Sequence, residues 1–297
     1  MQAIKNIYIK LIEQLEEKDS LDIKELEDLC LKNDQASLKL EIDFKISRNK
    51  VENVKLNNIN EFMCYDNDKL IGYIGICNFG GDILEINGMV HPMYRRKGIF
   101  KKLFSLVKDE WSRRESKKML LLSDNNSDSG LEFIKYTGAA YEHSEYEMYL
   151  NKNFDISFKD RNVFLRKATN EDSREIALQN SIYFNMEFKE DDITMVDEED
   201  NDNSFTYIAE VNNKIIGKVR LEITNKMGAI YGLGVLPEHR SKGYGREILI
   251  NAIEQLKDRN VDVIMLQVLT KNKNALNLYK SCGFEETSTM NYYEILK

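Results

Sequence analysis

Residues 234–250 combine the residue types that hold a phosphate group. The stretch reads Gly-Val-Leu-Pro-Glu-His-Arg-Ser-Lys-Gly-Tyr-Gly-Arg-Glu-Ile-Leu-Ile. Gly243 and Gly245 remove side chains where a backbone must approach an anion, and the N–H groups that open a helix favour negative charge. Three basic residues add attraction: Arg240, Lys242 and Arg246. The composition predicts a pyrophosphate-binding loop, with an ordinary glycine-containing turn as the alternative.

This loop needs a strand before it and a helix after it. Residues 229–233 have strand character, and apolar residues recur at helical spacing behind the loop: Ile248, Leu249, Ala252, Ile253 and Leu256. Further on, the apolar run 261–268 is short enough for a buried parallel strand, and residues 272–282 are predicted to be helical. The glycines therefore lie at a strand-to-helix transition, where neighbouring strands diverge and ligands bind.

Two segments resemble the GNAT superfamily of N-acetyltransferases. The first is similar to the family's acetyl-coenzyme A signature: Val235-x-Pro237-x-x-Arg240-x-x-Gly243-x-Gly245. The second follows at the family's usual distance: Asn272-x-x-Ala275-x-x-Leu278-Tyr279-x-x-x-Gly283-Phe284. The resemblance implies acetyl-coenzyme A as acyl donor. It also implies that the cofactor is bound by Leu233, Gly234, Val235, Arg240, Ser241, Lys242, Gly243, Tyr244, Gly245, Arg246, Asn272, Ala275 and Tyr279.

The same resemblance implies transfer of an acetyl group to a primary amine. In the family, a bulge in the strand before the loop frees a backbone N–H for the acetyl oxygen, and here that position falls at 233–235. Tyr279 occupies the family's general-acid position, and a phenol with a pKa of about 10 is protonated at neutral pH. A core tyrosine is the alternative. Asn272 matches the residue that bonds the pantetheine arm, and a helix N-cap is its alternative role.

The general base is left open by the sequence. In the ribosomal-protein alanine acetyltransferases, which residues 160–297 also resemble, a Glu precedes the Asn of the second segment; here Gln267 stands there, and an amide is no base. The substitutes considered are Glu222, an acid of the segment 187–202, and a water relayed through Tyr231. His239 is interpreted as a packing or hydrogen-bonding residue.

An acidic segment suggests the charge of the acceptor. In this fold the segment after the first helix borders the acceptor pocket, and here it carries Glu187, Glu190, Asp191, Asp192, Asp197, Glu198, Glu199 and Asp200. These acids would favour a small cationic amine. A solvated acidic loop is the alternative.

The chain repeats one frame. Its two prolines, Pro92 and Pro237, lie 145 positions apart, and the same shift places 90–100 onto 235–245. The sequence therefore predicts an α/β (α+β) fold with two tandem GNAT-like domains, 1–152 and 160–297, each a mixed, partly parallel twisted sheet flanked by helices. The arrangement resembles the mycothiol synthases.

The first copy is degenerate. Phe100 stands at the position of Gly245, Ser127 at that of Asn272 and Ile134 at that of Tyr279. Because Ile has no proton to donate, domain 1–152 is expected to be catalytically silent. Weak coenzyme A binding and a purely structural role both remain open for it.

The chain start is predicted less directly. Ile4, Ile7, Leu11 and Leu15 share a helical face over 4–18, and Ser20 or Asp22 is expected to cap a second helix. Alternation over 38–46 predicts a strand. This opening does not match the strand-first start of the family. A hairpin of two strands is expected over 61–77. Further strands are expected over 83–90, 119–123, 141–150, 162–167, 205–211, 214–224 and 284–296. Helices are expected over 98–115, 131–136, 170–184 and 243–257.

Composition narrows the function classes. A net charge of −8 and a pI near 5.2 argue against nucleic-acid binding. Four cysteines and three histidines without ligand spacing predict neither a metal nor a disulfide framework, and no apolar run predicts a membrane segment, so a cytoplasmic protein is expected. Besides acetylation of a small-molecule amine, the alternatives are protein N-terminal acetylation and a coenzyme A-binding sensor without turnover. The sequence does not fix the oligomeric state.

Overall fold

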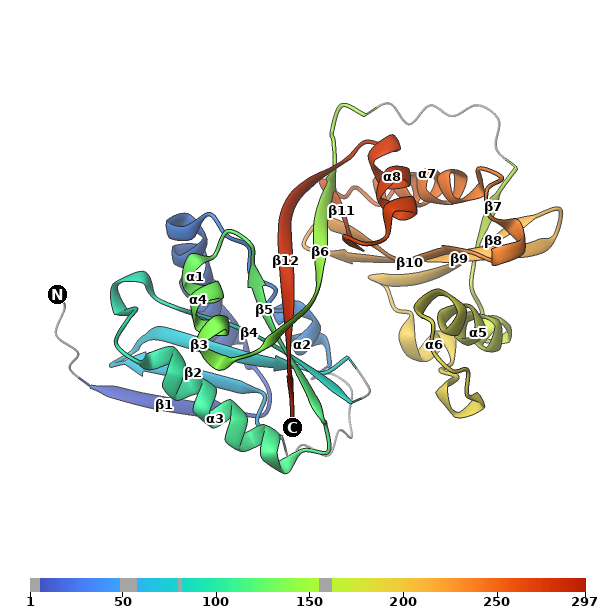
Figure 1. Ribbon diagram of the computed structural model, residues 1–297. Helices are drawn as coiled ribbons and strands as arrows, with labels where there is room; N and C mark the ends of the chain where they lie inside the picture. Colours follow the sequence, from blue (N-terminus) through green and yellow to red (C-terminus); the bar gives the residue numbers. More distant parts are fainter. Residues whose placement is uncertain (1–5, 49–57, 80–81, 155–161) are drawn as a thin grey trace. The chain divides into compact units, whose positions relative to one another are not determined.

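The computed structural model describes residues 6–48, 58–79, 82–154 and 162–297, which form two compact units (Figure 1). Unit 1 comprises Met1–Ser144 and Ser288–Lys297, and unit 2 comprises Glu145–Thr287. Each unit is built on a mixed sheet with helices on both faces, as the sequence predicted. Within the described residues, no helix is both long and apolar enough to cross a bilayer.

The sheet of unit 1 has helices on both of its faces. Its elements are β1 (Ile7–Ile12), α1 (Glu17–Asp34), α2 (Ile42–Arg48), β2 (Glu61–Asp66), β3 (Lys69–Cys77), β4 (Ile83–Val90), the 3-10 turn η1 (Pro92–Tyr94), α3 (Ile99–Arg113), β5 (Lys118–Asp124) and α4 (Asp128–Thr137). Phe62 and Cys64 join the core under α3, whereas Met63 and Tyr65 join the core under α1. Successive side chains of β2 therefore pack into the cores on opposite faces of the sheet.

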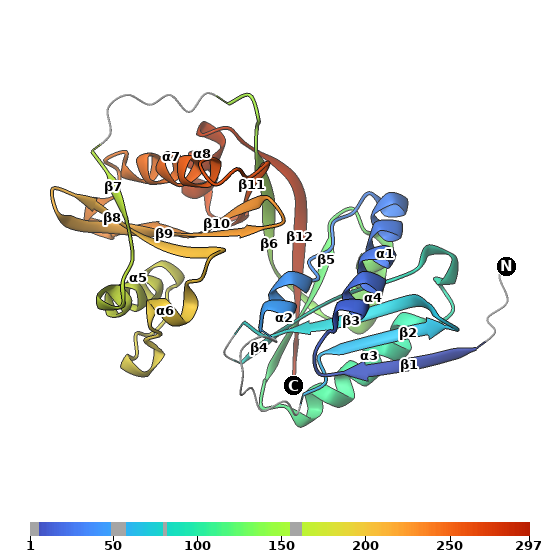
Figure 2. The ribbon, with the colours of Figure 1, turned by 180° about the vertical axis from the view of Figure 1, so that it is seen from behind.

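Unit 2 repeats this plan. Its elements are β7 (Phe164–Lys167), η2 (Asn170–Asp172), α5 (Ser173–Phe184), η3 (Glu190–Asp192), α6 (Val196–Glu199), β8 (Ser204–Val211), β9 (Lys214–Thr224), β10 (Met227–Val235), η4 (Pro237–His239), α7 (Tyr244–Lys257), β11 (Val263–Leu269) and α8 (Lys273–Ser281). The helices α7 and α8 cover one face of the sheet, and α5 and α6 cover the other (Figure 1 and Figure 2).

Two strands are exchanged between the units. β6 (Ala140–Leu150) begins in unit 1, but its residues 145–149 pair antiparallel with β11 of unit 2. β12 (Phe284–Leu296) begins in unit 2, and its residues 290–296 pair antiparallel with β5 of unit 1. The strand order is β1-β2-β3-β4-β5-β12 in unit 1 and β6-β11-β10-β9-β8-β7 in unit 2. Each sheet is thus completed by the other half of the sequence.

This exchange distinguishes the observed units from the consecutive domains 1–152 and 160–297 expected from the sequence. The strand expected at 141–150 forms, but half of it serves unit 2 rather than closing unit 1. Residues 155–159, which belong to the stretch between the two expected domains, lie outside the described residues.

The predicted chain start was wrong. Ile7–Ile12 is a strand paired with β2, not a helix, so unit 1 does begin strand-first over its described residues; Ile4 lies outside them. The following helix begins at Glu17 after a Glu16 cap, rather than at Ser20 or Asp22. β-branched residues and cross-strand pairing outweigh the helical spacing there.

The strand predicted over 38–46 was also wrong. The segment Ile42–Arg48 is helix α2. Glu41 has a left-handed backbone (φ 55°), which interrupts an extended chain, and Ile42 and Ile46 then face one core at a spacing of four.

The 145-residue repeat extends to backbone details. Left-handed conformations recur at paired positions: Asn67 and Asn212, Arg96 and Ser241, Gly98 and Gly243, Gly138 and Gly283. The bulge between Cys64 and Tyr65 recurs between Ala209 and Glu210. Because such irregular positions are not imposed by regular strands or helices, their recurrence identifies the units as two copies of one fold.

Candidate active site

The central strands of unit 2 diverge beside a bulge. The parallel pairing of β10 with β11 runs from Met227–Val263 to Ile230–Leu266, although both strands continue further. Between Tyr231 and Gly234, β10 advances three residues while β9 advances two, from Arg220 to Lys218. The extra residue places an irregularity at 232–233, adjoining the position expected for an oxyanion donor. The β3–β4 pair of unit 1 has no such register shift along its described residues.

Behind the bulge, the chain turns through η4 into α7. Ser241 and Gly243 adopt left-handed backbones (φ 61° and 84°), and Gly243 is the N-cap of α7. Arg240 donates from Nε to the carbonyl of Val235 (2.9 Å), and Lys242 donates to the carbonyl of Glu238 (3.1 Å). Arg240, Ser241, Lys242 and Gly243 are exposed. The loop therefore presents cationic side chains and first-turn N–H groups to solvent, a suitable cradle for phosphates.

Gly245 lies where α7 packs closely against α8. A Cβ on Gly245 would lie 3.3 Å from Leu278 Cδ2 of α8 and 3.7 Å from Val235 Cγ2. Next along α7, Arg246 donates to the Ser281 hydroxyl (3.0 Å), which ties the two helices together. A side chain at position 245 would therefore crowd the contact between the two helices.

The second sequence segment folds as expected. Asn272 is the N-cap of α8, and its Oδ1 accepts from the N–H of Ala275 (3.1 Å), so the capping role is confirmed. Tyr279 is buried in the unit 2 core, and the partly buried Leu233, Val235, Tyr244 and Ala275 pack against the same core. Burial raises the pKa of Tyr279 to about 12, which keeps the phenol protonated.

A buried lysine lies beside the bulge. Lys218 of β9 pairs with Gly234 and is 4% exposed, and its Nζ lies 3.5 Å from the Gly232 carbonyl oxygen and 5.9 Å from the centre of the Tyr183 ring. Burial, aided by Arg220, lowers the pKa of the Lys218 ammonium to about 8. Sequence reasoning missed this residue, because a lysine in an alternating strand reads as solvent-exposed.

Tyr183 of α5 closes the same region. A Cβ on Gly234 would lie 2.2 Å from Tyr183 Cε2. The Tyr183 ring can therefore pack against the strand only because residue 234 has no side chain. The Tyr183 hydroxyl donates to Gln179 Oε1 (2.9 Å). Burial raises the pKa of Tyr183 above its ordinary value. Together, Tyr183 and Lys218 line the α5 side of the bulge.

Comparison with known families places the chain in one of them. The model of the Acetyltransferase (GNAT) family matches it twice, over residues 23–135 and 174–284, which together are more than half of the chain. This chain belongs to the GNAT family of acetyltransferases. GNAT enzymes generally use acetyl-coenzyme A as acyl donor, and the double match confirms the tandem arrangement.

Curated relatives of this GNAT protein include enzymes with different acceptors. The [ribosomal protein bS18]-alanine N-acetyltransferase of Escherichia coli K12 is 31% identical over 83 residues, 28% of this chain and 56% of the relative. An N-alpha-acetyltransferase of Sulfurisphaera tokodaii is 27% identical over 100 residues, 29% of this chain and 60% of the relative. A mycothiol acetyltransferase of Thermobispora bispora is 40% identical over 58 residues, 20% of each chain. The matches span at most 60% of these relatives.

Solved structures share the whole fold of this GNAT protein. A GCN5-related N-acetyltransferase from Sphaerobacter thermophilus has a TM-score of 0.77 at 17% identity, covering 98% of this chain and 95% of that one. A tandem GNAT protein from the clavulanic acid biosynthesis pathway has a TM-score of 0.69 at 12% identity, covering 98% of both chains. At these identities the likeness concerns the fold.

The substitutes considered for a general base have other partners. Glu222 Oε1 lies 3.4 Å from Arg220 Nε in an ion pair. Tyr231 is 37% exposed and pairs across the sheet with Arg220. Gln267 is directly opposite Glu147 of the exchanged strand β6, so a carboxylate does adjoin that position from outside the residues that sequence reasoning weighed.

The acidic segment is partly neutralised within the chain. Glu190 pairs with Arg174 (2.8 Å), and Arg220 contacts Glu199 (3.4 Å) and Asp200 (3.2 Å). Asp197 and Glu198 are exposed at α6. Within the described part of the chain, no cluster of three His, Cys, Asp or Glu side chains suits a metal ion.

Unit 1 has the same backbone elements at the corresponding site, but different side chains at three of its positions. Ser127 caps α4 as Asn272 caps α8, with Oγ accepting from Gly130 N (3.3 Å). Ile134 is buried at the position of Tyr279. Phe100, at the position of Gly245, meets Phe133 edge-to-face with ring centres 4.6 Å apart.

Proposed function

We propose that this protein transfers an acetyl group from acetyl-coenzyme A to the primary amine of a small, cationic molecule, and that unit 2 carries the reaction. The observation that carries this proposal is the coincidence, in one unit, of the β10 bulge, the glycine loop opening α7, and the buried Tyr279. Unit 1 lacks a glycine at 100 and a tyrosine at 134, and its β4 is regular, which supports a silent role for it.

In this proposal, the first turn of α7 and Arg240, Lys242 and Arg246 hold the phosphates of the donor. Gly245, Asn272, Ala275 and Tyr244 would hold the extended arm. Bound acetyl-coenzyme A supplies an acyl group activated as a thioester. A backbone N–H of 233–235 donates to the acetyl oxygen as negative charge develops, and one such donor is commonly worth roughly 3 kcal/mol of the barrier.

Two proton transfers complete the chemistry. As the new C–N bond forms and the C–S bond breaks, Tyr279 donates its phenolic proton to the departing sulfur. We assign the opposite transfer to Lys218: in its neutral form the amine accepts the proton that the attacking nitrogen loses. With a pKa of about 8, about one Lys218 in ten is neutral at pH 7, and the fraction rises steeply above that pH.

The function is tested by Tyr279→Phe. Because this change deletes a proton donor without removing the ring, we expect kcat to fall about 10²- to 10³-fold while acetyl-coenzyme A affinity changes less than about threefold. Release of the coenzyme A thiol is followed with polyamine and peptide-amine panels, and affinity is followed by calorimetry.

The panel also separates the alternatives. Turnover with peptide amines only would identify a protein N-terminal acetyltransferase. Tight acetyl-coenzyme A binding by both the wild type and Tyr279→Phe, with no acceptor turned over by either, would refute the enzyme and leave a sensor. An equal loss of binding and turnover would show that Tyr279 is structural.

The acceptor charge is tested by neutralising the exposed acids of α6. Asp197→Asn with Glu198→Gln is expected to raise the KM for a polyamine about three- to tenfold at low salt, and less at about 0.5 M salt, because screening weakens long-range attraction. The matched control neutralises two exposed acids of unit 1, Asp109→Asn with Glu115→Gln, and leaves KM unchanged. Equal KM values for both double variants would contradict the cationic acceptor.

A further inference from the structure

A row of polar residues crosses three strands of the unit 2 sheet beside the β10 bulge. Gln267 of β11 lies directly opposite Glu147 of β6. On its other side, β11 pairs with β10 up to Ile230–Leu266, and the next residues of the two strands are Tyr231 and Gln267. Tyr231, Gln267 and Glu147 are called the polar row here, and each keeps part of its surface exposed.

The polar row lies on the face of the sheet that also carries Lys218. The chain neighbours of the row, Ile230, Leu266 and Met148, all belong to the unit 2 core. Successive side chains of a strand point to opposite faces, so the row points away from that core. The same holds for Lys218, whose neighbour Val219 is also a core residue. The row therefore leads from the site of the proposed transfer across to β6.

Glu147 is the charged end of the polar row. Its backbone carbonyl accepts from the Thr287 hydroxyl (3.1 Å), which fixes this part of β6 from the side opposite β11. Burial, the charge of Glu147 and a hydrogen bond to its side chain raise the pKa of Tyr149 to about 12. This phenol is therefore a neutral donor to the carboxylate. A carboxylate has about four lone-pair positions and can bond a phenol and an ammonium at once.

A guanidinium on the same face is neutralised within the chain. Arg220 of β9, which pairs with Tyr231, contacts three carboxylates: Glu199 (3.4 Å), Asp200 (3.2 Å) and Glu222 (3.4 Å). Its positive charge is thus outweighed by the acids around it. An ammonium group that approaches the polar row is consequently attracted rather than repelled.

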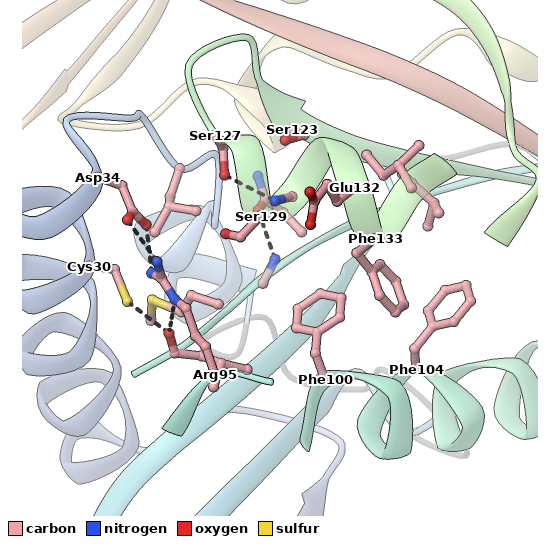
Figure 3. Close-up of a pocket in the computed structure, with 18 of the residues that line it drawn as sticks. Cys30, Asp34, Arg95, Phe100, Phe104, Ser123, Ser127, Ser129, Glu132 and Phe133 are labelled. Atoms are coloured by element: carbon pink, nitrogen blue, oxygen red, sulfur yellow. Dashed lines mark hydrogen bonds and ion pairs between the residues drawn. The ribbon is translucent and has the colours of Figure 1, made fainter. Parts of the chain in front are cut away.

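The corresponding part of unit 1 carries no charge. A cavity of about 370 Å³ lies there at the ends of β4 and β5 (Figure 3), and Leu122 is one of its lining residues. Leu122 pairs with Tyr292, and both side chains are buried. These two residues lie 145 positions from Gln267 and Glu147, respectively. An uncharged pair therefore completes the sheet at this register, and the fold itself does not require the carboxylate in unit 2.

The strand order sets the distance between the two ends of the row. Neighbouring strands lie about 4.8 Å apart, so β6 is roughly 10 Å from β10 across β11. The proposed transfer takes place at the β10 bulge. An ammonium bound by Glu147 is therefore roughly 10 Å from the nitrogen that is acetylated, which an extended chain of about eight bonds can span at about 1.5 Å a bond along its zigzag.

We propose that the acceptor is a linear diamine, and that Glu147 binds its second ammonium while the first amine is acetylated. This inference rests on the proposed function, whose acceptor it specifies. The chemistry is unchanged: the new C–N bond forms at the amine beside the bulge, and the distant ammonium keeps its proton. Tyr231 and Gln267 flank the carbon chain between the two nitrogens.

Three amines test this assignment on the full chain: heptane with an amine at both ends, heptylamine, and propane with an amine at both ends. In diaminoheptane the nitrogens are about eight bonds apart, whereas in diaminopropane they are too close to reach both sites. We expect kcat/KM for diaminoheptane to exceed that for the other two by about five- to twentyfold, beyond the factor of two for its second reactive end. Equal values for diaminoheptane and heptylamine would overturn the proposal.

The residue is tested by Glu147→Gln, which keeps the shape and an oxygen for the Tyr149 hydroxyl. We expect KM for diaminoheptane to rise about five- to twentyfold, and the constants for heptylamine and diaminopropane to stay within about twofold. The matched control is Asp262→Asn, an exposed acid just before the opposite end of β11, which should change none of them. An equal fall in kcat for all three amines would make Glu147 a general base and would overturn its binding role.

Binding separates this inference from the proposed function. Calorimetric titration of diaminoheptane into the protein with coenzyme A is expected to show the same five- to twentyfold loss, about, in Glu147→Gln. If this loss is seen but no amine is turned over, the transfer fails and the diamine site stands. If amines are turned over but the variant treats all three alike, the diamine site fails and the transfer stands. If the variant does not fold, the order of the three amines on the wild type decides.

Discussion

Gly245→Phe is expected to weaken acetyl-coenzyme A binding by about a hundredfold and to abolish turnover with it. The Cβ alone would come within 3.3 Å of Leu278 Cδ2, and a phenyl ring would have to pack between α7 and α8, as Phe100 packs against Phe133 in unit 1. Competing with a ring packed between two helices costs about 1–3 kcal/mol, which corresponds to roughly fivefold to 150-fold in affinity. Calorimetric titration measures this directly.

Graded and reciprocal variants serve as controls. Gly245→Ala adds only the Cβ, which Leu278 can accommodate by a shift of a few tenths of an ångström, so we expect a loss below about fivefold. Phe100→Gly, the reciprocal change in unit 1, is expected to leave the unit 2 affinity unchanged. If Gly245→Phe folds with wild-type circular dichroism and still binds the donor normally, the donor does not pass this glycine.

Lys218→Met is expected to change catalysis and stability in opposite directions. Loss of a general base lowers kcat about 10²- to 10⁴-fold. Removing a buried ammonium whose pKa is lowered from 10.5 to about 8 should raise the free energy of unfolding at pH 7 by about 3 kcal/mol, since a tenfold change in a protonation equilibrium corresponds to about 1.4 kcal/mol. Urea unfolding and steady-state rates measure the two effects.

The sign of the pH dependence follows from the depressed pKa. Below pH 8 both the folded and unfolded chains carry a protonated Lys218, and the penalty of burial is fully present. Between about pH 8 and 10.5 the unfolded chain binds more protons, so wild-type stability rises with pH relative to Lys218→Met. In the same proposal, wild-type kcat rises toward pH 8 and levels off above it, and this inflection disappears in the variant.

Lys214→Met is the matched control, because Lys214 is an exposed lysine at the start of the same strand. It should alter neither rate nor stability by more than experimental error. A stable Lys218→Met with full activity would remove Lys218 from the mechanism. If Glu147→Gln then abolished turnover, the base would be the carboxylate that the exchanged strand places opposite Gln267.

Local chemistry explains what the sequence could predict. The glycine loop, the Asn272 cap and the repeat could be predicted because each depends on a short segment. In each segment, the residue types themselves determine the backbone conformation. The strand at 7–12 was predicted as a helix because its pairing with β2 decides its structure. The helix at 42–48 was predicted as a strand because the left-handed backbone of Glu41 ends the extended chain before it. These are tertiary facts that periodicity within a short window does not contain.

Lys218 was missed for the same reason. Its pKa is lowered by burial, and one of the groups packed near its ammonium is Tyr183, about 35 positions earlier in the chain. This environment leaves no sequence signal beyond the residue type.

The exchange of β6 and β12 has a consequence for biosynthesis. β5 is complete at Asp124, but its partner segment ends at Leu296, so more than 160 residues must be translated before the two can pair. At about 5–20 residues per second, the free edge of β5 waits roughly ten to thirty seconds. During that time the faces of Leu120 and Leu122, later covered by Met290 and Tyr292, are open to chaperones or to other nascent chains. The first half of this protein therefore finishes folding last.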